Sequence, residues 1–253
     1  MLEKKPLLSL RNISKAYKAQ HETIQALKNV SMDLYEGEIV SLLGINGAGK
    51  STLSAIIATL YPPSTGELCM DGVSVYKNVP NYRMHIGLCP QHPNLNAELT
   101  LEQNLVFSGM AYRMPQAQAQ QRAKELMHAF ELTRYAQQTA NILSGGFKQR
   151  FSLARSLMHN PSIIILDEPT VGLDPHVRHE LWEYVKKLRD NGKTILLTTH
   201  YLEEAEELSD RVYVLDKGII KIEGTPETLK ADFNKGSLQS VFLELIKNNE
   251  EIV

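Results

Sequence analysis

The alternation of apolar and polar residues predicts strands in the first forty residues of the chain. Val30, Met32 and Leu34 are apolar and are separated by polar residues, which is the period-two pattern of a strand with one buried face. Glu36 and Gly37 follow as a turn signal. We therefore expect antiparallel strands at the N-terminal end of the chain.

Three later segments are apolar on both faces. They span residues 39–43, 162–166 and 194–199, and helical patterns separate them, the first over residues 52–60. Strands that are apolar on both faces lie inside parallel sheets that helices cover. The pattern therefore predicts an α/β fold with a mainly parallel sheet.

Residues 100–134 carry a helical pattern. Thr100 and Gln103 form a capping-box sequence, and the Gln-rich segment 116–121 is interpreted as the polar start of a helix. An apolar stripe with the spacing of an amphipathic helix follows, made of Ala123, Leu126, Met127 and Phe130. We expect a helical subdomain over about residues 92–154, inserted in a core of residues 1–91 and about 155–235.

A further helix is predicted from Pro175 to the stop signal at Asn191-Gly192, with Asp174 as its N-cap. Its inward residues are expected to be Val177, Leu181, Tyr184, Val185 and Leu188. A short helix over residues 202–208 follows the third buried strand, and its glutamates are interpreted as a solvated face: Glu203, Glu204, Glu206 and Glu207. Strands around Asp216–Gly218 and a helical tail over residues 236–253 complete the chain.

Composition excludes several classes of protein. The chain has 253 residues, 43% of them hydrophobic, and a net charge of −2, which is typical of a globular protein of one domain or of a core with a subdomain. Nothing in this charge indicates a nucleic-acid partner. Two cysteines, Cys69 and Cys89, are too few for a disulfide framework and are interpreted as buried hydrophobes in a reducing compartment.

The longest segment without Asp, Glu, Lys or Arg covers only residues 51–66, which is too short to span a membrane. The apolar part of the N-terminus is too brief for a signal peptide. We therefore expect a soluble, cytosolic chain.

A phosphate-binding loop follows the segment 39–43. Residues 44–51 match the pattern G-x-x-x-x-G-K-[ST] and lead into the predicted helix. Backbone amides at a helix N-terminus bind phosphate, Lys50 would hold the β- and γ-phosphates, and Ser51 would bind Mg²⁺. The nucleotide-binding residues predicted here are Gly44, Asn46, Gly47, Ala48, Gly49, Lys50, Ser51 and Thr52.

Two acidic residues, Asp167 and Glu168, end the strand 162–166. Beside a phosphate loop, Asp167 is placed to hold Mg²⁺ and Glu168 to orient or deprotonate an attacking water. Acidic residues at the end of a strand also commonly cap helices. The interpretation of Asp167 and Glu168 as catalytic therefore depends on the presence of the phosphate loop.

The segment 143–150, Leu-Ser-Gly-Gly-Phe-Lys-Gln-Arg, resembles the signature motif of the ABC (ATP-binding cassette) ATPases. The resemblance covers essentially the whole chain. Further residues match the family's motifs: Tyr17 the aromatic that stacks on adenine, Gln91 the glutamine loop, Asp174 the aspartate of the loop 171–174, and His200 the switch histidine. The resemblance implies a P-loop ATPase with catalytic residues Glu168, His200 and Gln91, and with Ser51, Gln91 and Asp167 near Mg²⁺.

The resemblance also implies partners. In this family, a second subunit presents its signature segment, here Ser144, Gly145 and Gly146, to the γ-phosphate, which predicts a head-to-tail dimer, most simply of identical chains, with two ATP molecules. It further implies a separate membrane permease whose cytoplasmic helices dock beside Gln91, and thus a location on the cytoplasmic face of the membrane. Residues 172–178 and 237–245 resemble the branch that exports drugs, lipids or polysaccharides.

The family's usual fifth signature residue is glutamine, and this chain has Phe147 there. Phosphate recognition by Ser144 should survive, and Phe147 is expected to pack with Phe151, Ala154 and Met158. His176 and His179 could suggest a metal, but no third ligand accompanies them. Two alternatives are a soluble ABC ATPase acting on nucleic acid or ribosomes and a regulator that seldom hydrolyses ATP.

Overall fold

The computed structural model describes residues 5–18 and 22–250. By its contacts the chain divides into two compact units. The first unit comprises Met1–Lys77 and Thr194–Val253, and the second unit comprises Asn78–Lys193. The predicted boundaries of the inserted helical subdomain, about residues 92–154, stay a prediction.

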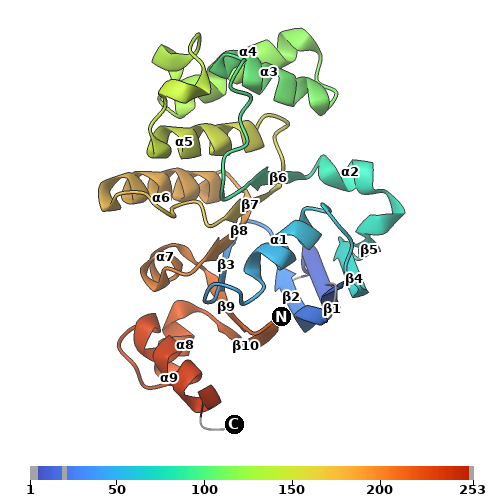
Figure 1. Cartoon of the computed structure of the whole chain (residues 1–253), viewed down its shortest axis with the longest axis vertical. Coiled ribbons are helices and arrows are strands. Elements are labelled where there is room, and N and C mark those ends of the chain that lie inside the picture. Colours follow the sequence, from blue (N-terminus) through green and yellow to red (C-terminus); the bar gives the residue numbers. More distant parts are fainter. Residues whose placement is uncertain (1–4, 19–21, 251–253) are drawn as a thin grey trace. The chain divides into compact units, whose positions relative to one another are not determined.

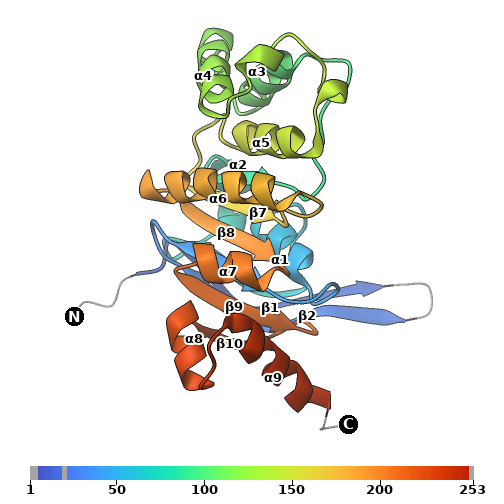
Figure 2. The same ribbon diagram turned by 90° about the vertical axis from the view of Figure 1, so that its left-hand side faces the viewer.

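An antiparallel sheet forms part of the first unit. Its strands are β1 (Leu8–Lys18), β2 (Thr23–Leu34), β4 (Thr65–Met70) and β5 (Val73–Ser74), in the order β2-β1-β4-β5. β1 and β2 form a long ribbon at the start of the chain (Figure 2). Val30, Met32 and Leu34 are at most 2% exposed, so the period-two pattern identified this strand and its buried face correctly.

The parallel strands of the first unit surround β3 (Ile39–Leu43). It lies between β8 (Thr194–Thr199) and β9 (Arg211–Asp216) and is parallel to both. β10 (Ile219–Gly224) pairs antiparallel with β9 (Figure 1). Every residue of β3 and β8 is buried, as their continuous apolar runs predict.

α1 (Lys50–Ile57) begins two residues earlier and ends three residues earlier than the predicted 52–60. Gly49, at φ 110°, sets the start because this left-handed backbone lies outside the helix. Thr59, at φ 54°, has left the right-handed helical region, so the helix cannot continue to Leu60.

Three helices of the first unit follow its last parallel strands: α7 (Leu202–Leu208), α8 (Pro226–Asp232) and α9 (Leu238–Glu250). They share an apolar cluster with β3 and β9. Members from these helices and strands are Leu43, Ala205, Val212, Val214, Leu229, Leu238 and Phe242.

The interpretation of the α7 glutamates as one solvated face was wrong. Glu204 is fully buried. Glu206 is half-buried, forms an ion pair with Lys230 at 2.8 Å and accepts a hydrogen bond from the backbone N–H of Leu238 at 3.1 Å. α9 packs against α7 and covers a second face of this helix. Of the four glutamates of α7, only Glu203 and Glu207 are exposed.

The second unit contains the parallel pair β6 (Ile86–Cys89) and β7 (Ile163–Asp167). Its helices are α2 (Val79–Arg83), α3 (Leu101–Ala111), α4 (Gln116–Ala129), α5 (Gly145–Ser156) and α6 (Pro175–Asp190), with one-turn helices η2 (Thr133–Tyr135) and η3 (Ala140–Ile142). The capping box at Thr100 and Gln103 is formed, and the predicted stripe of α4 is buried. The predicted fold class, α/β with an N-terminal antiparallel sheet, is confirmed.

α6 differs from its prediction in detail. Asp174 occupies the N-cap position but makes no capping hydrogen bond with its side chain. Leu181 and Val185 are buried as predicted, and Trp182 joins them in the core. The remaining inward residues of the prediction are only half-buried: Val177, Tyr184 and Leu188.

The two cysteines differ in environment. Cys89 is buried and donates a hydrogen bond to Ser152 Oγ at 3.4 Å, and burial raises its pKa to about 11. Cys69 is half-buried, so the expectation of two buried thiols holds only for Cys89. Within residues 5–18 and 22–250, no helix has the length and apolar character that a membrane crossing requires.

His159 makes folding of the second unit sensitive to acid. Its ring stacks on Tyr112 with centroids 3.6 Å apart, and its Nε2 lies 2.9 Å from the carbonyl oxygen of Ile86. Burial, assisted by the charges of Lys193 and His85, lowers the pKa of His159. The charged imidazole is therefore disfavoured in the folded chain, so stability is full above the unfolded pKa, about 6.5, and falls as the pH drops through the lowered pKa.

We expect the thermal midpoint to fall between pH 7.5 and pH 5.5, and His159→Gln to reduce this fall. Circular dichroism melts of both proteins at several pH values measure it. His128→Gln, which alters an exposed histidine of α4, is the matched control and should keep the wild-type pH dependence. An unchanged dependence in His159→Gln would show that other groups cause the acid sensitivity.

Candidate functional site

The predicted phosphate loop of the first unit lies between β3 and α1. Ile45, Asn46 and Gly47 are exposed, whereas Gly44 and Ala48 are buried. The backbone N–H of Gly44 donates a hydrogen bond to the carbonyl oxygen of Thr199 at 3.3 Å. The backbone N–H of Gly218 donates one to the carbonyl oxygen of Ala48 at 2.9 Å. The loop is therefore fixed at both ends, and its middle faces solvent ahead of the helix N-terminus.

Lys50 crosses the inner side of this loop. Its side chain is buried, at 4% exposure, and its Nζ donates to the carbonyl oxygens of Gly44 and Ile45 at 2.8 and 3.2 Å. Ser51 is exposed and Thr52 half-buried at the start of α1. A cationic group and the positive end of a helix thus converge on one exposed loop, which is an arrangement suited to a polyphosphate.

Strand β2 supports the loop from the side. A Cβ on Gly49 would lie 2.7 Å from the carbonyl oxygen of Ala26, so only glycine allows this approach. Tyr17 on β1 pairs with Ile24, two residues before Ala26 in β2. The strand register therefore brings Tyr17 to the neighbourhood of the loop.

Tyr17 is 37% exposed. Its ring meets Tyr61 edge-on at 6.2 Å between centroids, and Lys15 Nζ lies over it at 5.5 Å. Its stacking on adenine stays a prediction.

His200 follows β8 directly, as Gly44 follows β3. The pairing of Leu43 with Thr199 places both chain positions at the same end of parallel strands. His200 is half-buried, and its ring lies 4.3 Å from that of Tyr201. Ends of adjacent parallel strands are where α/β proteins bind ligands.

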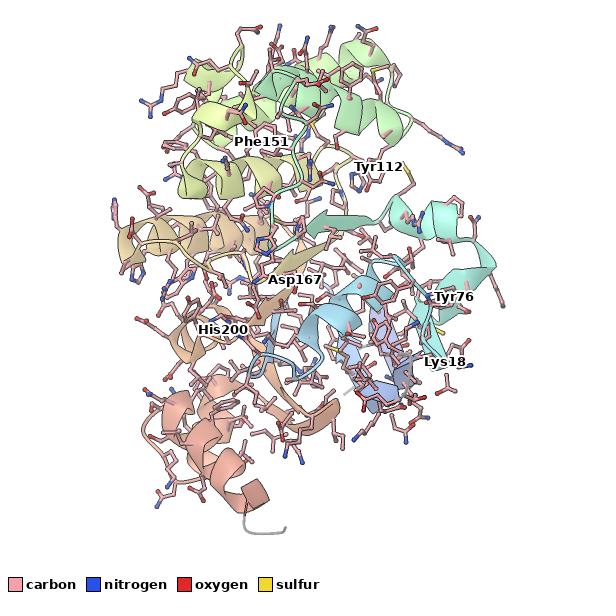
Figure 3. The ribbon with its side chains drawn as sticks, in the orientation of Figure 1. Lys18, Tyr76, Tyr112, Phe151, Asp167 and His200 are labelled. Carbon is pink, nitrogen blue, oxygen red and sulfur yellow. The ribbon has the colours of Figure 1, made fainter. Side chains whose placement is uncertain are left out.

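Figure 3 labels His200, which belongs to the first unit, and Asp167, which belongs to the second unit. In the second unit, Asp167 ends β7 and Glu168 begins the following turn. Glu168 is 8% exposed, has φ 46°, and its Oε2 accepts a hydrogen bond from Gln91 Nε2 at 3.3 Å. Positive φ is unusual for a residue with a side chain, and such positions cluster at functional sites. Gln91 and Glu168 were both predicted as site residues from the sequence, but their hydrogen bond was not.

The signature segment forms the exposed start of α5. Ser144 is the N-cap of α5, and its Oγ accepts a hydrogen bond from the backbone N–H of Phe147 at 3.5 Å. Ser144 and Gly145 are exposed. Asp174, at the start of α6, is also exposed. The N-terminus of the 12-residue helix α5 is therefore open to an external anion.

Phe147 packs against one-turn helix η2 rather than in the core. Its ring meets that of Tyr135 at 5.1 Å, and the guanidinium groups of Arg134 and Arg150 lie 5.6 and 5.1 Å from its centroid. Arg150 in turn forms ion pairs with Glu131 and Glu180. The stripe predicted for Phe147 is formed only by its other members, because Phe147 itself is half-buried.

Gly146 lets α5 approach α6. A Cβ at this position would lie 2.5 Å from Val177 Cγ1, whereas a Cβ on Gly145 would meet nothing closer than Leu173 at 3.8 Å. We expect Gly146→Ala to destabilise the chain by about 1–3 kcal/mol, the usual cost of overpacking. Gly145→Ala is the matched control and should leave the melting midpoint near the wild-type value. Equal midpoints for the two variants would contradict this packing.

His176 and His179 do not lie together in a ligand set. His176 Nε2 is 3.5 Å from Glu180 Oε1, and His179 packs edge-on against Trp182. Across the part of the chain that the structure describes, no group of three His, Cys, Asp or Glu side chains forms a metal cluster.

The family model of the ABC transporter domain matches residues 27–171, more than half of the chain. The chain belongs to the ABC transporter family. The match includes the phosphate loop, Gln91, the signature segment, Asp167 and Glu168, and it excludes Tyr17, Asp174 and His200.

Curated relatives are similar over most of this chain. Nod factor export ATP-binding protein I of Rhizobium meliloti (strain 1021) is 44% identical over 203 residues, which are 80% of this chain and 61% of the relative. A daunorubicin resistance ATP-binding protein of Streptomyces coeruleorubidus is 40% identical over 220 residues, or 87% of this chain and 70% of the relative. The chain thus spans about three fifths of the first relative's length.

Solved structures share the fold. The structure of an ATP-binding subunit of an ABC transporter has a TM-score of 0.83 and 34% identity, covering 95% of this chain and 99% of that one. A dimeric ATP-binding cassette in a post-hydrolysis state, bound to ADP and Pi, has a TM-score of 0.79 and 35% identity, covering 86% and 98%.

Proposed function

We propose that this chain binds and hydrolyses ATP and powers a separate membrane permease that exports its cargo. The observation that carries the proposal is the phosphate loop of residues 44–51, with Lys50 buried along its inner side and the start of α1 open behind it. The relatives named for Nod factor export and drug resistance support the exporter branch. The net charge of −2 gives no support to action on nucleic acid.

Catalysis is then a matter of positioning and electrostatics. Lys50 turns from the loop carbonyls toward the β- and γ-phosphates, and the loop amides and α1 stabilise their charge. Glu168 accepts a proton from the attacking water, and the hydrogen bond from Gln91 orients its carboxylate. His200 contacts the γ-phosphate, and Tyr17 stacks on the adenine.

The residues proposed for Mg²⁺ have the donor chemistry that this ion prefers. Ser51 offers an exposed hydroxyl oxygen, Asp167 a half-buried carboxylate and Gln91 an amide oxygen. When bound, the ion neutralises charge that develops on the transferred phosphoryl group.

A second copy of the chain completes the pocket. Ser144 and Gly145 are exposed at the N-terminus of α5, and Asp174 is exposed at the start of α6, so these groups are available to a nucleotide held by another chain. The dimeric cassette among the similar structures supports this assembly. We infer a head-to-tail homodimer that lies at the cytoplasmic face of the membrane through its permease.

The test is co-purification from detergent-solubilised membranes. The tagged chain should recover a polytopic membrane protein in fixed stoichiometry, and the complex should hydrolyse ATP faster than the isolated chain. Recovery of ribosomes or nucleic acid in place of a membrane protein would reject export. ATP binding without hydrolysis, by both the complex and the isolated chain, would indicate the regulator alternative.

A further inference from the structure

Three side chains of the first unit meet near the end of strand β1. The rings of Tyr17 and Tyr61 meet edge-on, with centroids 6.2 Å apart and planes at 81°. The ammonium group of Lys15 lies over both rings, 5.5 Å from the centroid of Tyr17 and 5.1 Å from that of Tyr61. We refer to these three residues as the lysine–tyrosine cluster. The nucleotide-binding motifs of the sequence include only Tyr17 of the three.

The backbone fixes the position of Lys15 as well as the rings do. This residue is half-buried, and its Nζ donates a hydrogen bond to the carbonyl oxygen of Pro62 at 2.7 Å. Pro63 follows, and because proline rings fix φ, the carbonyl group belongs to a stiff segment of backbone. An ammonium group has three N–H donors, so it keeps this hydrogen bond while it faces both tyrosine rings.

Two further hydrogen bonds join β1 to the segment that follows α1. The backbone N–H of Ser64 donates to the carbonyl oxygen of Ser14 at 2.8 Å, and the N–H of Ala16 donates to Ser64 Oγ at 3.1 Å. Ser14 and Ala16 are the neighbours of Lys15 in the chain. The backbone segments that carry the two rings are therefore held together. The phosphate loop lies at the other end of α1, which has eight residues.

The lysine–tyrosine cluster determines which face of Tyr17 is available to a ligand. The faces of an aromatic ring are negative and its edge is positive, so a cation is attracted to a face and a second ring packs edge-on. Lys15 occupies one face of Tyr17, and the edge-on contact with Tyr61 restricts rotation of the ring. Tyr17 is still 37% exposed, so part of its ring is open to a flat ligand.

We propose that Lys15 and Tyr61 are positioning residues for the base of ATP, because they hold the ring of Tyr17 in one orientation with one face open to the adenine. This rests on the proposed function, in which Tyr17 stacks on the adenine. A side chain that is fixed before binding loses little rotamer freedom on binding, and the affinity is higher for that reason. The effect concerns only the base, since the loop of residues 44–51 binds the phosphates.

The affinities for two ligands measure this effect. ATP carries the base, whereas ribose 5′-triphosphate has the same sugar and phosphates without it. In isothermal titrations of the full chain with Mg²⁺ present, Lys15→Met should weaken ATP binding about two- to fivefold, the range for a partly exposed cation–π contact. Its affinity for ribose 5′-triphosphate should equal that of the wild type. Lys15→Arg keeps a cation that stacks on aromatic faces and should restore most of the ATP affinity.

Substitutions of the two tyrosines complete the test. Tyr61→Leu should weaken ATP binding about two- to tenfold, the range for an aromatic pair, with no change for ribose 5′-triphosphate. Tyr61→Phe keeps the ring and should bind ATP as the wild type does. Tyr17→Leu should also weaken ATP binding. Lys15→Met added to Tyr17→Leu should cause no further loss, because a positioning residue acts through the ring that it holds.

Two matched controls change the same types of residue elsewhere in the first unit. Lys28→Met removes the charge of an exposed lysine of β2. Tyr76→Leu removes a tyrosine of the one-turn helix η1 (Val75–Lys77) that is 38% exposed and is labelled in Figure 3. Both variants should bind ATP and ribose 5′-triphosphate with wild-type affinity.

The results separate this inference from the proposed function. If the wild-type chain binds neither ligand, both fail. If Tyr17→Leu weakens ATP binding but Lys15→Met and Tyr61→Leu do not, only this inference fails. Equal losses of affinity for both ligands in Lys15→Met would give this lysine a general structural role. A further loss when Lys15→Met is added to Tyr17→Leu would mean direct contact with the base, and either result overturns the positioning role.

Discussion

Replacing Glu168 with glutamine is expected to leave ATP binding intact and to slow hydrolysis by about 100-fold or more, the usual contribution of a positioned general base. Glutamine keeps the size of the side chain and can still accept the hydrogen bond that Gln91 donates at 3.3 Å. It cannot take a proton from water. The backbone at φ 46° and the buried position therefore stay as they are, and only the chemistry is removed.

Titration with a fluorescent ATP analogue and a phosphate-release assay measure the two effects separately. Glu183→Gln is the matched control, because Glu183 is an exposed residue of α6 in the same unit. This variant should hydrolyse ATP at the wild-type rate. Undiminished hydrolysis by Glu168→Gln would remove Glu168 from its assigned role. Loss of binding together with hydrolysis would mean that the carboxylate shapes the nucleotide site instead.

Lys50→Met is expected to weaken ATP binding by about 10- to 100-fold, because it removes a charged donor to the phosphates worth about 1.5–3 kcal/mol. Hydrolysis should fall to background. The buried lysine also stabilises the loop, because its Nζ donates to the carbonyls of Gly44 and Ile45. Methionine has a similar length, so it fills the space without the charge.

Isothermal titration with ATP measures the affinity. Lys28→Met, at an exposed position of β2 in the same unit, is the control and should bind ATP as the wild type does. Wild-type affinity in Lys50→Met would place the phosphates away from this loop. A thermal midpoint far below that of the control would show that bracing the loop is the main function of Lys50.

Local sequence patterns predicted the structural features that depend on residues close together in the chain. The apolar runs identified β3, β7 and β8, and the Thr100 capping box is formed. The phosphate loop was located by spacing alone, because a strand, a glycine-rich loop and a helix start are all set within a few residues.

Contacts between distant segments were not predictable from these patterns. Glu206 is half-buried because α9, more than thirty residues later, packs against α7. The hydrogen bond from Gln91 to Glu168 joins residues 77 positions apart. Ala26 approaches Gly49 only because β2 folds beside the loop.

The signature segment shows the same limit. Its residues matched a motif, and the helical spacing predicted that Phe147 packs in the stripe of Phe151, Ala154 and Met158, but Phe147 is only half-buried. Its place between Tyr135 and two arginines depends on η2 and α5 packing together.

The most direct test of the shared pocket combines two inactive chains. Lys50→Met and Ser144→Arg are co-expressed with different tags, and the mixed dimer is isolated by both tags. If each pocket uses the phosphate loop of one chain and Ser144 of the other, the mixed dimer has one intact pocket and should hydrolyse ATP at about half the wild-type rate. A mixed dimer as inactive as its two parents would contradict the account, because it would place Ser144 and Lys50 of the same chain in one pocket.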